Sequence, residues 1–143
     1  SMEFVEAGFN YRMTDFQAAL VASQMGRFDE ILERKRYLSK IYFSLLDTDR
    51  ITLPCIPNDR PHTWQTFHVL VDSSIDRDKL IISMKENGVG VNYGAQCIPS
   101  LKFYYQKYKL NSEINYPNAW RAFKTGLALP IYEKLNNDQI QYI

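Results

Sequence analysis

Apolar residues recur at helical spacing through the first third of the chain, between Phe16 and Leu45. Thr14 begins a capping box, in which its hydroxyl and the Gln17 side chain satisfy free amides of the first helical turn. The pattern therefore predicts one long helix from Thr14 to about Leu46. Gly26 lies within it, and either bends the helix or allows another backbone to approach closely.

Alternation of apolar and polar residues from 66 to 71 predicts a strand with at least one buried face. Asp76 is expected to cap a second helix, and Gly88 suits the left-handed residue that ends it. The apolar run from 89 to 93 is interpreted as another strand. The residues assigned to the buried face of the first strand are Phe67, Val69 and Val71.

The last third of the chain contains shorter signals. A polar loop is predicted for residues 111–115, and Pro117 fits the first turn of a helix that follows. Residues 127–131 form an apolar run that Pro130 confines to an edge or an end of a sheet. Asn136 is expected to cap a last helix. Together these elements predict a single α+β domain over residues 1–143, with helices packed on a small, mostly antiparallel sheet.

Composition excludes several classes of function but does not identify one. The chain of 143 residues is 45% hydrophobic and carries a formal net charge of +1, which gives no general electrostatic reason to bind nucleic acid or an anionic membrane. Cys55 and Cys97 lack metal-ligand spacing and accompany only two histidines, so neither a zinc site nor a disulfide framework is predicted. With no export signal or spanning segment visible, we expect a cytoplasmic protein with no metal.

One short segment combines groups that bind anions. The residues from Gly8 to Asp15 place an amide, a phenol and a guanidinium just before a helix N-terminus, where backbone amides and the helix dipole favour phosphate oxygens. An ordinary capped helix preceded by solvated polar residues explains the same spacing. The pattern alone leaves both interpretations open.

This segment, Gly8-Phe9-Asn10-Tyr11-Arg12-Met13-Thr14-Asp15, resembles a motif of the DegT/StrS family of nucleotide-sugar aminotransferases. The resemblance runs from about Gly8 to the end of the chain. Other stretches match the family in order and approximate spacing: His62-Thr63-Trp64-Gln65-Thr66-Phe67, Asp76-Arg77-Asp78-Lys79-Leu80, Gly88-Val89-Gly90, Tyr104-Tyr105, Pro117-Asn118-Ala119 and Leu127-Ala128-Leu129-Pro130-Ile131-Tyr132.

The resemblance implies the type I aminotransferase fold, with this chain as its C-terminal small domain. In that fold a large N-terminal domain carries the lysine that binds pyridoxal phosphate, and we expect this chain to be a fragment that lacks it. No lysine of the chain matches the family's cofactor segment. We therefore expect the fragment to bind no cofactor and to be inactive alone.

The resemblance also implies a homodimer, in which the loop before the first helix reaches the neighbouring subunit's cofactor. Asn10 becomes the leading candidate for a hydrogen bond to the cofactor phosphate. Arg12 follows as an ion-pair or substrate-phosphate partner, and Tyr11 as a wall of the pocket. An amide donates without transferring a proton, and a guanidinium neutralises charge.

Candidate substrate contacts lie in two further stretches. His62 and Trp64 precede the first strand in a segment that, in the family, lies near the substrate cleft; a loop histidine beside a core tryptophan is the alternative. Tyr93 and Gln96 stand where many family members carry histidines, which are absent here. An amide and a phenol would recognise sugar hydroxyls through neutral hydrogen bonds.

These inferences predict that the parent protein moves an amino group from an amino acid, with glutamate expected, to a keto group of a nucleotide-linked sugar. A sugar dehydratase of the same family is an alternative. A free-standing carbohydrate- or nucleotide-binding module and a purely structural dimerisation domain are two further ones. The high aromatic content also predicts an apolar surface, on the long helix and on residues 103–108, through which the isolated chain associates.

Overall fold

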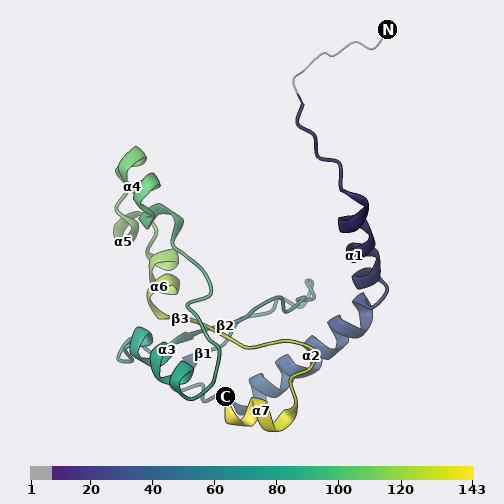
Figure 1. Ribbon diagram of the computed structural model, residues 1–143. Helices are drawn as coiled ribbons and strands as arrows, with labels where there is room; N and C mark the ends of the chain where they lie inside the picture. The colour runs from purple at the N-terminus through teal and green to yellow at the C-terminus, as the bar shows by residue number, and fades with distance from the viewer. Residues whose placement is uncertain (1–7) are drawn as a thin grey trace.

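The computed structural model describes residues 8–143 and has an α+β architecture, as the sequence predicts. Figure 1 shows a central sheet and two arms on either side of it, one formed by α1 at the far end of α2 and the other by α4, α5 and α6. The elements are α1 (Asp15–Met25), α2 (Phe28–Leu45), β1 (Ile51–Thr52), β2 (Phe67–Val71), α3 (Arg77–Glu86), the 3-10 turn η1 (Ile98–Ser100), α4 (Lys102–Tyr108), α5 (Ser112–Asn115), α6 (Pro117–Thr125), β3 (Gly126–Leu129) and α7 (Asn137–Tyr142).

The single long helix predicted at the N-terminal end is wrong, because the chain forms two helices. Gly26 keeps a helical backbone with φ −61°, but Arg27 leaves it at φ −114° and ψ 8°. Glycine lowers helix stability by about 1 kcal/mol relative to alanine, so the break falls where the helix is weakest. The predicted start is confirmed, since the Thr14 hydroxyl accepts from the Gln17 amide at 3.3 Å in a complete capping box.

The sheet is antiparallel with the order β1-β2-β3, as predicted for a small antiparallel sheet. The strand expected at residues 89–93 is wrong in extent, since only Asn92 forms a bridge, to Ala128. The chain turns away at Gly94, whose φ of +75° is incompatible with a continuing strand. The short strand β1 was not predicted, because two residues give no readable alternation.

The loop predicted for residues 111–115 is also partly wrong, because Ser112–Asn115 form one helical turn. The Asn111 side chain accepts from the amides of Glu113 and Ile114, which is the contact expected of an N-cap. The predicted helix beginning at Pro117 and the edge position of β3 are both confirmed.

Helices cover both faces of the sheet. Phe67, Val69 and Val71 are buried, as predicted, and Tyr42 of α2 stacks on Phe67 with ring centroids 4.8 Å apart. The opposite face, which carries His68, lies against α6 near the beginning of β3. On this second face, the polar side chain of His68 lies close to the loop that contains Tyr93.

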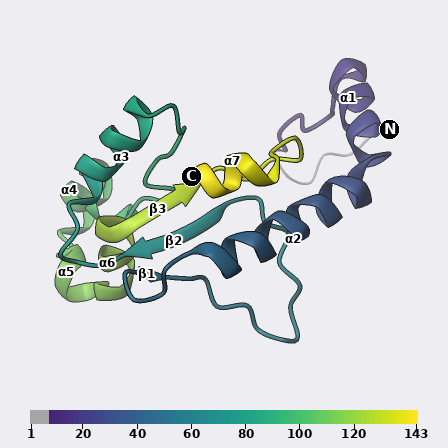
Figure 2. The same cartoon turned by 90° about the horizontal axis from the view of Figure 1, so that it is seen from below.

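Two side chains of α2 attach the C-terminal segment to the core. Arg34 donates from Nη2 to the Leu135 carbonyl at 2.6 Å, and the Tyr42 hydroxyl donates to the Pro130 carbonyl at 2.8 Å. Figure 2 shows α7 beside α2 in this arrangement. The predicted cap at Asn136 is confirmed by a capping box with Gln139. In the described part of the chain, no helix has the length and apolar character that crossing a bilayer requires.

Candidate functional site

The loop before α1 presents a connected pair of polar side chains. The Asn10 carbonyl oxygen accepts from the Arg12 backbone amide at 3.1 Å and from Arg12 Nε at 3.3 Å. These contacts orient the Asn10 side chain through its oxygen, which leaves its amide NH2 as the group available for an acceptor. Both side chains can therefore offer donors to the same anion.

This loop packs on little of the chain's own core. Tyr11 is 87% exposed, and Phe9, whose ring lies 5.8 Å from it, is 82% exposed. Residues 10–13 line an open hollow of about 470 Å³ together with Gln17 and Val21 of α1. No side chain of α1 is buried. Large rings at this exposure are typical of a surface that another protein surface covers.

His62 and Trp64 form a local pair, as their spacing suggests. The Trp64 amide donates to His62 Nδ1 at 2.8 Å, and the two rings lie 4.3 Å apart. With Nδ1 accepting, the neutral imidazole carries its proton on Nε2, where it can donate. Trp64 itself is 3% exposed and stacks on Phe67, so its side chain supports the loop from within the core.

Tyr93 and Gln96 lie on a tight turn between α3 and α4. The Gln96 amide donates to the Tyr93 hydroxyl at 3.2 Å, and both side chains reach solvent. The Gly94 amide donates to the Asn92 side chain at 2.6 Å, which closes the turn. An amide and a phenol are thus held together at two of the positions that were predicted as substrate contacts.

The structure brings the predicted residues together in three groups: Asn10 with Arg12, His62 with Trp64, and Tyr93 with Gln96. No hydrogen bond among the described residues joins one group to another. In Figure 1 the loop before α1 and the helices that follow the Tyr93 turn belong to opposite arms of the molecule. Within one copy of the described chain, these groups do not form a single site.

Two residues near the Tyr93 turn were not predicted as site residues. His68 lies in β2, and its Nε2 is 3.3 Å from the Tyr93 carbonyl oxygen. Arg77 was noted only as part of a matching motif, and its guanidinium lies 5.7 Å from the centre of the Tyr93 ring. Both residues reach the turn across many positions of the chain, so the sequence carries no local signal for them.

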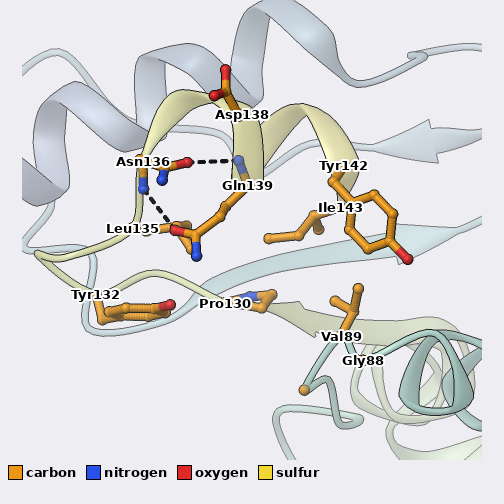
Figure 3. Close-up of a pocket in the computed structure, with 11 residues that line it drawn as sticks. Gly88, Val89, Pro130, Tyr132, Leu135, Asn136, Asp138, Gln139, Tyr142 and Ile143 are labelled. Carbon is orange, nitrogen blue, oxygen red and sulfur yellow. Dashed lines mark hydrogen bonds between the residues drawn. The ribbon is translucent and has the colours of Figure 1, made fainter.

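A larger hollow, of about 670 Å³, lies between α7 and residues 88–90 (Figure 3). Its lining holds one carboxylate side chain, that of Asp138, which Figure 3 shows pointing away from Pro130 and Tyr132 on the opposite wall. The Tyr142 hydroxyl is already bonded to the Asn87 carbonyl at 3.0 Å. None of the predicted site residues lines this hollow, and residues 8–143 contain no group of three metal ligands.

Solved structures that share this fold include aminotransferases. Spr1654 from Streptococcus pneumoniae, assigned as a sugar aminotransferase and solved in a pyridoxal phosphate form, superposes with a TM-score of 0.86 at 23% identity, over 99% of this chain and 36% of its own. Helicobacter pylori PseC, an aminotransferase involved in the biosynthesis of pseudoaminic acid, superposes with a TM-score of 0.81 at 18% identity, over 99% of this chain and 40% of its own.

The sequence comparison is consistent with the fold. The spore coat polysaccharide biosynthesis protein SpsC of Bacillus subtilis is 27% identical over 96% of this chain and 36% of SpsC. A sequence model of the DegT/DnrJ/EryC1/StrS aminotransferase family matches residues 1–143. The chain belongs to this family, as its motifs predicted, and spans about 36% of the length of the curated relatives it matches.

Proposed function

We propose that the protein containing this chain transfers an amino group from an amino acid, with glutamate as the expected donor, to a keto group of a nucleotide-linked sugar. The match of the whole chain to the DegT/DnrJ/EryC1/StrS family is the observation that carries this proposal. The chain is proposed to be the C-terminal small domain of the protein. A preceding domain would supply the cofactor lysine.

The residues of the N-terminal loop fit the phosphate of pyridoxal phosphate. A phosphate group only accepts hydrogen bonds, and the Asn10 amide and the Arg12 guanidinium supply donors without a nearby carboxylate partner in the described contacts. Tyr11 would form an aromatic wall beside them. When bound, the cofactor supplies an electron sink for the amino-transfer chemistry.

The exposure of this loop supports a site that is completed between subunits. In the proposed homodimer, Asn10, Tyr11 and Arg12 of one subunit contact the cofactor held by the other. The separation of the three groups of polar residues within one chain also favours this arrangement. His62 and the Tyr93 turn are proposed to contact the sugar nucleotide, while Trp64 holds His62 in place.

The lysines support the proposal that this chain is not catalytic alone. In the described residues every lysine is exposed except the half-buried Lys35. A lysine that binds the cofactor covalently needs a lowered pKa, which burial or a neighbouring cation provides. We expect only scattered labelling of the 143-residue chain by pyridoxal phosphate and borohydride. Stoichiometric labelling of one lysine would contradict this.

The decisive experiment uses the full-length protein loaded with pyridoxal phosphate. Incubation with glutamate and a panel of nucleotide-linked keto sugars should produce an amino sugar, detected by mass spectrometry, and an equal amount of 2-oxoglutarate. A reaction without glutamate is the control. A product that has lost water without gaining nitrogen would identify the dehydratase alternative, and tight sugar binding without cofactor or turnover would identify a binding module.

A further inference from the structure

The Tyr93 turn rests on a histidine that no motif assigns to the site. His68 Nε2 lies 3.3 Å from the Tyr93 carbonyl oxygen, which also accepts from the Ala95 amide at 2.9 Å. A carbonyl can only accept, so the ring nitrogen that faces it must carry a proton. His68 therefore holds the backbone of the turn from the sheet below it.

Two glycines make the space for this imidazole. A Cβ added at Gly94 would collide with His68 Cδ2, and one added at Gly126 would collide with the Ala122 carbonyl oxygen as well as with His68 Nε2. An alanine at Gly94 does not fit while the ring stays in place, whereas one at Gly126 is already excluded by the Ala122 backbone. The half-buried imidazole thus lies between the turn on one side and the start of β3 on the other.

A second residue holds the side chain of the turn. Arg77 is 7% exposed, and its guanidinium lies 5.7 Å from the centre of the Tyr93 ring, within cation–π range. Phe123 meets the same ring edge-on at 6.1 Å. Tyr93 nevertheless remains 40% exposed, with its hydroxyl bonded to the Gln96 amide. The ring is fixed while its polar end stays accessible.

We propose that His68 and Arg77 are positioning residues that hold the Tyr93–Gln96 pair in the geometry that recognises sugar hydroxyls. The proposal rests on the proposed function, in which this turn contacts the sugar nucleotide. Preorganised polar groups bind more tightly, because less conformational entropy is lost on binding. Neither residue touches the reacting atoms in this scheme.

The test uses the full-length enzyme and compares four variants at His68 and Leu70. His68→Ala and His68→Asn remove the contact with the Tyr93 carbonyl, whereas His68→Gln can place an amide NH2 near the position of Nε2. Leu70→Ala, on the same face of β2, is the matched control for destabilisation alone. Thermal melting and cofactor absorbance are recorded for each.

The loss of one hydrogen bond should raise the KM for the keto sugar roughly threefold to tenfold in His68→Ala and His68→Asn. The KM for glutamate and the cofactor spectrum should not change, and His68→Gln should recover most of the loss. The proposal is overturned if, in the His68 variants, the KM values for both substrates rise together in proportion to the fall in melting temperature. Leu70→Ala shows the change in KM that destabilisation alone produces.

Two further variants separate this inference from the proposed function. Tyr93→Phe and Gln96→Ala remove the sugar contacts themselves. If neither raises the KM for the keto sugar, the turn does not bind the sugar and the assignment of the site fails. If both raise it while His68→Ala does not, the turn binds the sugar and the positioning role of His68 fails.

Discussion

Arg77 donates from Nη1 to the Gly126 carbonyl at 2.7 Å, which attaches the first turn of α3 to the start of β3. The same nitrogen donates to the Phe123 carbonyl at 3.0 Å, at the C-terminal end of α6. A cation is unfavourable at a helix N-terminus and favourable at a C-terminus. Arg77 nevertheless occupies the N-terminus of α3, because its guanidinium donates to the Phe123 and Gly126 carbonyls at the C-terminal end of α6. Carbonyl groups at the end of a helix have no partner within the helix, and Arg77 supplies one.

We predict that Arg77→Ala lowers the free energy of unfolding by about 2–4 kcal/mol, because two carbonyls lose a charged donor in a buried place. Asp78→Ala is the matched control. It removes the 2.7 Å ion pair with Arg77 Nε, but the Asp78 side chain is 80% exposed, so the loss should be below about 1 kcal/mol. Urea titrations of both variants measure the difference. Equal losses would contradict the anchoring role of the carbonyl contacts.

Tyr42 makes stability depend on pH in the alkaline range. Burial, with a smaller contribution from Tyr132, raises the pKa of Tyr42 well above its ordinary value, and the neutral hydroxyl donates to the Pro130 carbonyl. The folded state thus retains a proton that the unfolded state releases above about pH 10. The contribution of Tyr42 is complete below that pH and is lost as pH rises through the folded pKa.

The expected result is a fall in the free energy of unfolding above pH 10 that is shallower in Tyr42→Phe than in the unmodified chain. At neutral pH the same variant should lose about 1–2 kcal/mol, because the Pro130 carbonyl is left without its donor. Tyr37→Phe is the control, since that hydroxyl is exposed and lies 3.5 Å from Asn137. Parallel pH profiles for Tyr42→Phe and the unmodified chain would refute the assignment.

Gly88 and Gly94 allow conformational strain to be separated from steric conflict. Both have positive φ, +80° and +75°, but a Cβ at Gly88 would meet nothing within 4 Å, whereas one at Gly94 would meet His68. Gly88→Ala should lower the free energy of unfolding by about 1–2 kcal/mol through its backbone alone. Gly94→Ala should cost about 1–3 kcal/mol more.

The double variant Gly94→Ala with His68→Ala tests the origin of that excess. Removing the imidazole should abolish most of the extra cost, so the two substitutions should be strongly non-additive. Chemical denaturation of the four proteins gives the coupling energy. Simple additivity would mean that His68 does not occupy the space beside Gly94.

Features with local signals could be predicted from the sequence. The capping boxes at Thr14 and Asn136, the buried alternation from 67 to 71 and the left-handed Gly88 depend on a few neighbouring residues, and each is present. The break at Gly26 and Arg27 was expected at most as a bend, and the strand expected at residues 89–93 is reduced to one bridge at Asn92, because the local apolar pattern continues through both stretches. Helix or strand propensity alone does not show at which residue a helix or a strand ends.

The polar groups of the candidate site also differ in whether their contacts are local or distant in the sequence. The pairs Asn10 with Arg12 and Tyr93 with Gln96 are separated by two and three positions, within short segments that were singled out by comparison with the family's motifs. His68 reaches Tyr93 across 25 positions and Arg77 reaches Gly126 across 49, so no local pattern contains them. Such contacts depend on how β2, β3 and α3 pack together.

The N-terminal loop makes a prediction for cofactor retention in the full-length protein. Asn10→Ala should lower pyridoxal phosphate content after gel filtration, because it removes both a phosphate donor and the acceptor that orients Arg12. Arg12→Lys should also impair retention, since a lysine keeps the charge but lacks the forked donors. Gln24→Ala, on the exposed far end of α1, is the control. Full cofactor occupancy in both loop variants would remove this loop from the site.

The exposed apolar surface of α1 predicts association of the 143-residue chain. Phe16, Leu20 and Met25 are 75%, 53% and 59% exposed, and no residue of the helix is buried, so α1 contributes nothing to the core of its own chain. Large apolar side chains on an uncovered helix favour self-association, because each chain can cover the other's surface. We expect dimers or larger species in analytical ultracentrifugation at micromolar concentration. Phe16→Asp combined with Leu20→Lys should give a monomer with an unchanged far-ultraviolet spectrum, since neither side chain supports the fold.

Phe103→Asp, on the exposed aromatic helix α4, tests the other predicted surface. If Phe103→Asp alone abolishes association, the contact is made by α4 and not by α1. A monomer in the unmodified chain would contradict both predicted surfaces.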